Sequence, residues 1–222
     1  MKNTKKRKRL RVGRLFLVLI VITLISFLCV KLFEIPIMSV QITGNKILTD
    51  DDVLSFSKLE NYPSFFGTPM FSIKKNLKRN EYIKDVKVSK GIFNIKLNIT
   101  EHTVLYIEKE TNLKVTLKSK IKDDKAVCAP YLIGEVPTDK FDDFIKAMAR
   151  IDENILCKMS EIKYDPNEID KDRYFVHMND GNDVYLTVNK FDKINKYNSI
   201  LENVGKQNGI LYLDYGDYFK VK

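Results

Sequence analysis

At 222 residues the chain is long enough for two small domains, and its 38 Lys and Arg against 29 Asp and Glu give a formal net charge of +9. Nine of the basic residues and none of the acidic ones lie in residues 1–31, which leaves 29 residues of each sign in the remainder. A balanced remainder has no long-range field that attracts phosphates, so composition argues against a nucleic-acid partner.

An apolar run near the start of the chain predicts a membrane-spanning helix. Residues 15–30 carry no charge, and their polar side chains, Thr23 and Ser26, can bond back to their own helix. We expect the helix to cover residues 15–33, close to the roughly 20 residues that span ~30 Å of hydrocarbon. Residues 1–14 form a basic tail that the positive-inside rule places in the cytoplasm. The prediction is a single-pass type II protein with its N-terminus inside and its C-terminus outside.

A cleaved signal peptide shares the basic start and the apolar middle. Cleavage requires small residues, whereas Phe27, Leu28 and Cys29 occupy the corresponding positions. A lipoprotein acylation site would likewise need a small residue directly before Cys29. The pattern therefore favours an uncleaved anchor.

The two remaining cysteines, Cys128 and Cys157, fall in the exported part of the chain. Their compartment permits a disulfide, but the sequence does not fix the separation of their Cα atoms. A disulfide and two buried thiols both remain open.

Residues 35–103 predict a small domain that begins with a strand over residues 37–43. Its alternation places Met38, Val40 and Ile42 on the buried side. Thr49 then begins a helix as its N-cap, since three aspartates follow it in the first turn, where the helix dipole favours negative charge.

Two helices and two further strands complete this domain. We expect Ser72 to cap the second helix, and residues 82–88 and 93–100 to form the strands. The order strand, helix, helix, strand, strand predicts a three-stranded sheet covered on one face by two helices. The expected buried side chains are Val53, Phe56, Leu59, Ile73, Leu77, Val86, Val88, Phe93, Ile95, Leu97 and Ile99.

Residues 104–222 predict a second domain with a mixed sheet and helices, so the fold class is α+β. Thr138 is expected to cap a helix whose apolar residues recur at helical spacing. Asp180-Gly181 between two alternating runs predicts a β-hairpin. A further helix over about residues 191–204 and strands at 210–213 and 218–221 end the chain.

The last residues are extended and rich in aromatic side chains. A terminal strand at a sheet edge offers unpaired backbone groups to another chain, and tyrosines supply contact area at low entropic cost. The alternative is that these aromatics pack the sheet of their own domain. The candidate partner-binding residues are Tyr212, Leu213, Tyr215, Tyr218 and Phe219.

The sequence contains no catalytic, metal-binding or cofactor-binding pattern. A sortase-like cysteine enzyme would need a Thr-Leu-x-Thr strand before its cysteine, and neither Cys128 nor Cys157 has one. His102 and His177 lie 75 positions apart, with no close ligand spacing and no glycine-rich nucleotide loop. We predict no enzyme activity, no cofactor and no small-molecule substrate.

Three segments resemble the POTRA domain of the FtsQ/DivIB family of bacterial cell-division proteins. They are residues 38–45, 82–88 and 94–102, which read MSVQITGN, YIKDVKV and NIKLNITEH. The family's order of anchor, POTRA domain and β domain matches the order predicted over the whole chain.

The resemblance implies a bitopic scaffold of the division machinery. It would be enriched at the septum, bind membrane proteins of the FtsL and FtsB/DivIC type and help regulate septal wall synthesis. It implies partner binding by sheet extension at the C-terminal strands. Two alternatives stay open, namely a membrane-anchored wall enzyme of sortase or transpeptidase type and a POTRA-type secretion chaperone.

Overall fold

The computed structural model describes residues 12–205 and 207–222. The basic residues of the tail up to residue 11 lie outside the described residues. Helix α1 (Val12–Glu34) is exposed along its whole length and is long and apolar enough to cross a membrane. Thr23 Oγ1 donates to the carbonyl of Leu19 at 2.8 Å, as expected for a hydroxyl in an apolar helix.

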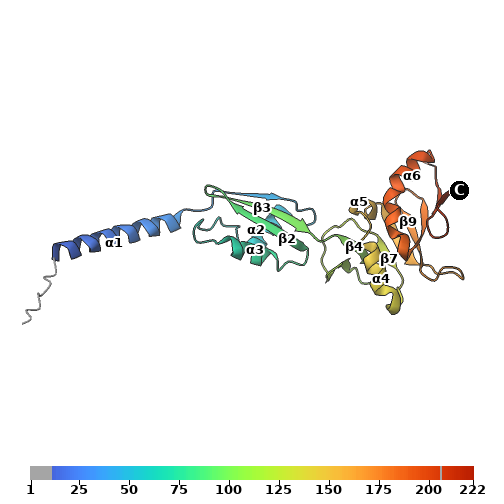
Figure 1. The fold of residues 1–222 in the computed structure, drawn as a ribbon, viewed down its shortest axis with the longest axis horizontal. Helices are drawn as coiled ribbons and strands as arrows, with labels where there is room; N and C mark the ends of the chain where they lie inside the picture. The colour runs from blue at the N-terminus through green and yellow to red at the C-terminus, as the bar shows by residue number, and fades with distance from the viewer. Residues whose placement is uncertain (1–11, 206) are drawn as a thin grey trace, which may run out of the picture. The chain divides into compact units, whose positions relative to one another are not determined.

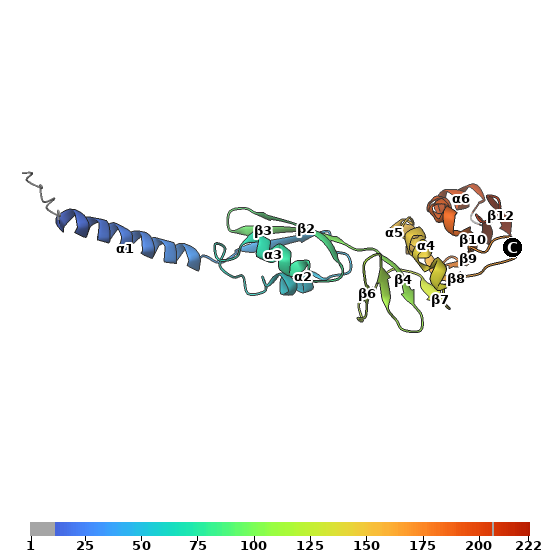
Figure 2. The same ribbon diagram turned by 60° about the horizontal axis from the view of Figure 1, so that its bottom comes forward.

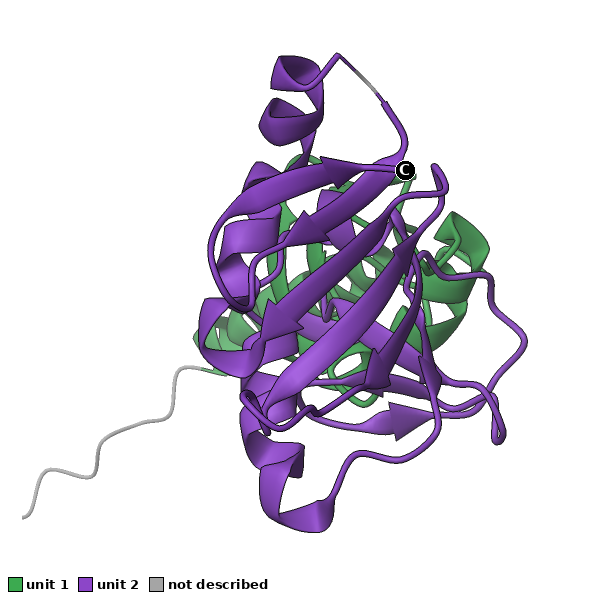
Figure 3. Ribbon diagram, turned by 90° about the vertical axis from the view of Figure 1, so that its right-hand side faces the viewer, with its two compact units in different colours: residues 1–80, 85–100 green, residues 81–84, 101–222 purple. Residues whose placement is uncertain are grey.

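The chain divides into two compact units, residues 1–80 with 85–100 and residues 81–84 with 101–222 (Figure 3). The first contains, besides α1, a three-stranded sheet in the order β1-β3-β2, with β1 parallel to β3. Both of its short helices lie on one face of this sheet (Figures 1 and 2). The elements are β1 (Ser39–Thr43), α2 (Asp50–Ser57), α3 (Met70–Leu77), β2 (Ile83–Lys90) and β3 (Asn94–Glu101).

Local sequence explains how these elements begin. Thr49 caps α2 in a full capping box, in which its hydroxyl accepts from Asp52 N at 3.1 Å and the Asp52 carboxylate accepts from Thr49 N at 2.9 Å. In β3 the alternation is as predicted, with Ile95, Leu97 and Ile99 buried. The predicted strand, helix, helix, strand, strand order is confirmed.

The second unit is a nine-stranded mixed sheet with helices on one face (Figure 2). Its strand order is β12-β11-β10-β9-β8-β7-β4-β5-β6. The strands are β4 (Val104–Glu108), β5 (Lys114–Thr116), β6 (Lys120–Ile121), β7 (Tyr131–Ile133), β8 (Met159–Tyr164), β9 (Arg173–Met178), β10 (Asp183–Thr187), β11 (Gly209–Tyr212) and β12 (Tyr218–Val221). The helices are α4 (Thr138–Met148), α5 (Glu153–Leu156), the 3-10 helix η1 (Val188–Lys196) and α6 (Tyr197–Asn203).

The core of this unit lies between the sheet and its helices. Phe144 of α4 is fully buried and stacks on Tyr174 of β9 at a centroid distance of 5.0 Å. Phe191 of η1 meets both rings edge-on, at 6.3 and 5.2 Å. This aromatic cluster fixes the helices on one face, and the other face of the sheet carries the half-exposed side chains described below.

Several predictions about single residues were wrong. Met38 precedes β1 and is 69% exposed, while its neighbour Ile37 is buried. Phe56 of α2 is 41% exposed, because Val53 and Ser57 form the buried face of that helix. Phe93 belongs to the turn before β3 and has a positive φ of 56°.

Two helix starts also differ from the prediction. Pro69 and Pro137 occupy the N-cap positions of α3 and α4, so Ser72 and Thr138 lie inside those helices. Neither cap has a side-chain hydrogen bond, because the proline ring has no acceptor atom.

Candidate interaction surface

The C-terminal hairpin forms one edge of the nine-stranded sheet. β12 pairs antiparallel with β11, with Tyr218 opposite Tyr212 and Phe219 opposite Leu211. Within the described residues no strand pairs with the other side of β12. This side is the open edge on which another chain could add a strand.

The structure places the five predicted contact residues in different environments. Tyr215 and Tyr218 are 79% and 52% exposed, and Tyr212 is half-buried. Phe219 is partly buried and packs against the core, whereas Leu213 is 2% exposed and belongs to the core itself. The exposed tyrosines are therefore available for direct contact, while Leu213 holds the hairpin in place.

An aromatic row crosses four neighbouring strands on the face opposite the helices. Its members are paired directly across the strands, so their side chains share one face. Successive ring centroids lie 5.2, 5.4 and 4.6 Å apart. The row consists of Phe175 (β9), Tyr185 (β10), Tyr212 (β11) and Tyr218 (β12).

Sequence reasoning missed the first half of this row. A signal existed, because the Asp180-Gly181 turn fixes the register of the β9–β10 hairpin and so sets Phe175 opposite Tyr185. The pairing of Tyr185 with Tyr212 is parallel and depends on the crossover through η1 and α6, so no local signal reveals it.

Two cations border the aromatic row. Lys163 Nζ lies 4.9 Å from the ring centroid of Phe175, and the Arg173 guanidinium lies 4.4 Å from that of Tyr185. Asp165 accepts from Arg173 at 2.7 Å, which fixes the guanidinium over the ring. The surface therefore combines ring edges with two cations that are already paired with carboxylates, Lys163 with Asp165 and Arg173 with Asp165 and Asp214.

A polar cluster lies beside the row, formed by His177 on β9, Asp183 on β10 and Lys222 directly after β12. Asp183 receives contacts from His177 at 2.8 Å and from Lys222 at 2.9 Å. Burial by itself would raise the pKa of the Asp183 carboxyl, but the hydrogen bonds from His177 and Lys222 outweigh it and hold that pKa below its ordinary value. Asp183 thus stays ionised and anchors the end of the chain to β10.

The rings of the row also restrict what can bind. Tyr212 lies nearly parallel to both of its neighbours, with interplanar angles of 24° to Tyr185 and 14° to Tyr218. Neighbouring faces therefore cover one another, and the row offers mainly ring edges. Such a surface suits a polypeptide that lies along the edge of the sheet, which can use backbone groups and side chains together.

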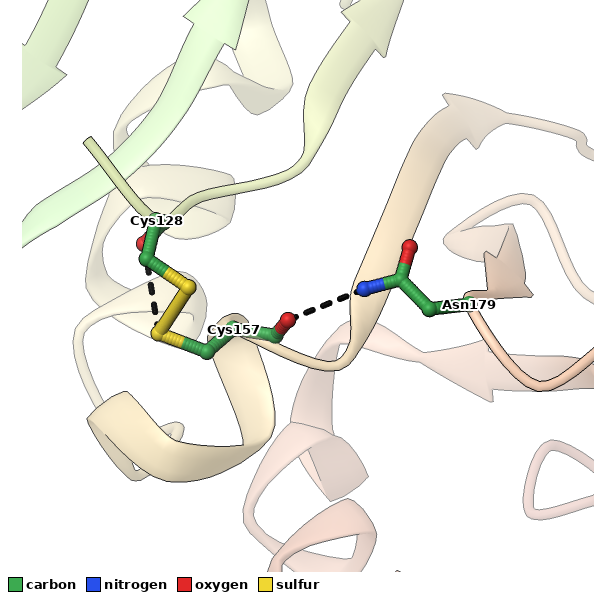
Figure 4. The surroundings of a disulfide bond; sticks show 3 residues. All are labelled: Cys128, Cys157 and Asn179. Carbon is green, nitrogen blue, oxygen red and sulfur yellow. Dashed lines mark hydrogen bonds between the residues drawn. A yellow bond between two sulfur atoms is a disulfide. The ribbon is translucent and has the colours of Figure 1, made fainter. Parts of the chain in front are cut away.

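The cysteines form a disulfide, which resolves the alternatives that the sequence left open. Cys128 in the loop before β7 is bonded to Cys157 at the end of α5, with their Cα atoms 4.9 Å apart (Figure 4). Asn179 donates to the carbonyl of Cys157 at 2.9 Å and ties this end to the β9–β10 turn. Neither sulfur is therefore a free thiolate nucleophile. In the described part of the chain no group of three His, Cys, Asp or Glu side chains is placed to hold a metal ion.

Both the POTRA-like segment of the first unit and the chain as a whole are similar to known proteins. A model of the POTRA domain of FtsQ type matches residues 35–102. Cell division protein DivIB of Geobacillus kaustophilus is 27% identical over 97% of this chain and 87% of its own length. DivIB of Listeria monocytogenes is 28% identical over 99% of this chain and 85% of its own length. DivIB of Bacillus subtilis is 24% identical over 97% of this chain and 87% of its own length.

Among the solved structures that resemble this chain is a domain of another DivIB protein. The major extracytoplasmic domain of DivIB from Geobacillus stearothermophilus, in its trans isomer, is 26% identical and covers 48% of this chain and 97% of its own, with a TM-score of 0.39. The POTRA match and the alignments along nearly the whole chain agree with the architecture of anchor, POTRA domain and mixed sheet. Residues 35–102 thus match the POTRA domain of FtsQ type, and the chain is similar along nearly its whole length to the bacterial cell-division proteins DivIB.

Proposed function

We propose that this chain is a scaffold of the division machinery that binds other bitopic division proteins, of the FtsL and FtsB/DivIC type, at the edge of its second sheet. It would act outside the cell with its N-terminus in the cytoplasm, gather at the septum and help assemble or regulate septal wall synthesis without being an enzyme. The observation that carries the proposal is the open edge of β12 beside the exposed Tyr215 and Tyr218.

The physical basis is sheet extension. A partner strand that pairs with β12 would satisfy its unpaired N–H and C=O groups. These backbone hydrogen bonds contribute affinity whatever the side chains of the partner strand are. Specificity would come from side chains that meet the end of the aromatic row at Tyr212 and Tyr218. In this proposal the β domain, residues 104–222, carries the partner-binding edge, and the POTRA domain, residues 35–103, lies between that domain and the membrane helix in the chain.

Capture of partners from detergent-solubilised membranes tests this site. We expect a truncation after Asp217, which removes β12, and the substitution Tyr218→Ala to reduce capture of the FtsL-type and DivIC-type proteins. The matched control is Tyr131→Ala, since Tyr131 is 42% exposed on β7 of the same sheet but lies away from the edge.

Two results would contradict the proposal. Unchanged capture by the truncated chain would refute sheet extension at β12. Normal septation after depletion of the protein in its native cell, or an even distribution of a tagged copy along the membrane, would refute the role in septal assembly.

A further inference from the structure

Two loops of the first unit lie against the segment that directly follows helix α1. Residues 60–69 form the connection between α2 and α3, and residues 90–94 form the turn between β2 and β3. Both are hydrogen-bonded to residues 35–38, and Pro36 also forms a β-bridge with Ser64. The backbone bonds are Phe65 N to Ile35 O at 2.9 Å, Ile37 N to Pro63 O at 3.0 Å and Met38 N to Phe93 O at 2.8 Å.

These bonds fix the distance of both loops from the end of the membrane helix. α1 ends at Glu34. An extended chain advances at most about 3.6 Å per residue, so Met38 lies within ~15 Å of that end whatever the orientation of α1. The headgroup layer adds about 5–8 Å on each side of the hydrocarbon. The chain connection therefore holds both loops at the outer surface of the bilayer.

The loops expose apolar side chains at this place. Ile92 is 86% exposed, Met38 69% and Phe66 46%. The ring of Phe66 rests edge-on against Phe65 and Phe93, at centroid distances of 5.3 and 6.4 Å. The three rings thus form one cluster, and Ile92 and Met38 adjoin Phe93, the first along the chain and the second through the Met38 N to Phe93 O bond, so these apolar residues are not scattered singly over the surface.

Most charges near the cluster are positive; the acidic exceptions are Glu60, at the start of the first loop, and Glu34, which pairs with Lys31 at 2.7 Å. Residues 61–73 contain no charged side chain, and residues 86–100 contain Lys87, Lys90 and Lys96 but no acidic one. Lys90 Nζ lies 4.4 Å from the ring centroid of Phe65 and donates to the Phe65 carbonyl at 2.5 Å. Aromatic side chains beside lysines are the combination that the interface of an anionic bilayer favours.

Backbone strain occurs in the same loops. Phe93 and Tyr62 have φ angles of +56° and +45°, in the left-handed region that bulky residues avoid. Such conformations persist where the surrounding structure imposes them, and they concentrate at functional sites. In the turn of residues 90–94 this conformation accompanies the outward position of Ile92.

We propose that residues 60–69 and 90–94 form a membrane-contact surface, which inserts Phe66 and Ile92 among the lipid headgroups of the outer leaflet. The surface holds the POTRA domain against the bilayer and limits its rotation about the link to α1. The proposal requires α1 to span the membrane and is independent of partner binding at β12. The proposed binding partner of this surface is lipid, and the test below distinguishes lipid from a protein that covers the same side chains.

The absence of tryptophan from the chain allows a direct test. The full-length variant Ile92→Trp is reconstituted into phosphatidylglycerol bilayers with and without bromine on the acyl chains near the headgroup. The matched control is Ile169→Trp, because Ile169 is 82% exposed in a loop of the second unit. Both positions are open to solvent, so neither substitution disturbs the core, and circular dichroism checks that both variants fold.

We expect the Ile92→Trp emission to shift to shorter wavelength and to be quenched about twofold by the brominated lipid, as for an interfacial side chain. The control should emit as in water and stay unquenched. Equal quenching of both variants, or a water-like emission from Ile92→Trp, overturns the proposal. Protection of Ile92→Trp from soluble acrylamide without quenching by lipid also overturns it, because a protein would then cover the surface.

Discussion

Replacing Lys114 by methionine tests a buried ion pair that supports the start of the second sheet. The Lys114 side chain is only 4% exposed, and its Nζ donates to both the carboxylate and the carbonyl of Asp123, the latter at 2.9 Å. The same carboxylate accepts from the Tyr82 hydroxyl at 3.0 Å. Burial, followed by the hydrogen bond to Asp123, raises the pKa of Tyr82, so the phenol stays a donor. Lys114→Met would leave the Asp123 charge without its cation.

The magnitude follows from the burial of each partner. Removing one member of a buried pair costs about 3–5 kcal/mol, because the other charge stays desolvated. Asp123 is 27% exposed in its side chain and keeps the bond from Tyr82, so part of the penalty is relieved. We expect a loss of about 2–3 kcal/mol, which lowers the melting temperature of a unit of this size by roughly 6–12 °C.

The matched control is Lys109→Met. Lys109 pairs with Glu161 at 2.8 Å, but the two side chains are 56% and 43% exposed, so its loss should cost at most about 1 kcal/mol. Thermal unfolding of the full chain in detergent micelles gives both values, and hydrogen exchange at β4–β6 locates the change. If Lys114→Met melts within about 3 °C of the wild type, or no lower than Lys109→Met, the pair does not stabilise the sheet and the reasoning fails.

Three further predictions concern stability. Phe144→Ala should lower the free energy of unfolding in urea by about 3–5 kcal/mol, because the ring is fully buried among other aromatic side chains. The control Phe71→Ala, at a position 73% exposed, should change it little. Equal effects of the two substitutions would contradict the assignment of the core. Burial alone would raise the pKa of Asp123, but hydrogen bonds lower it, so the stability it supplies is present above its unfolded value of about 3.9 and is lost as pH falls through its folded pKa. Wild-type protein should therefore lose more melting temperature between pH 5 and pH 3 than Asp123→Asn, and parallel curves would count against this. Cys128→Ser opens a disulfide across 29 positions and should cost about 2–4 kcal/mol, an effect that reductant reproduces in the wild type and not in the variant.

Much of the fold could be predicted because its signals are local. The capping box at Thr49 involves side chains three residues apart, and the alternation of Ile95, Leu97 and Ile99 needs only a strand with one buried face. The Asp180-Gly181 turn closes the β9–β10 hairpin for the same reason, since the three-residue loop between Met178 and Asn182, with Gly181 at a positive φ, fixes its register.

The errors arose where local patterns compete for one position. Met38 and Ile37 are apolar neighbours just before a strand, and the pattern alone does not show that Ile37, which is bonded to Pro63 of a distant loop, is the buried one. Thr138 and Pro137 can both begin a helix, and the structure has Pro137 at the N-cap with Thr138 as the first helical residue.

The sequence by itself determined the apolar anchor, the order of elements in the POTRA domain and the aromatic character of the chain's end, because each is a property of neighbouring residues. Only the tertiary structure decided that Tyr212 completes a row begun by Phe175, that Lys114 and Asp123 share a buried pair, and that Phe65 and Phe93 meet the residues after α1. These contacts depend on crossovers and loop paths, whose geometry is set by how the whole core packs and not by any short pattern.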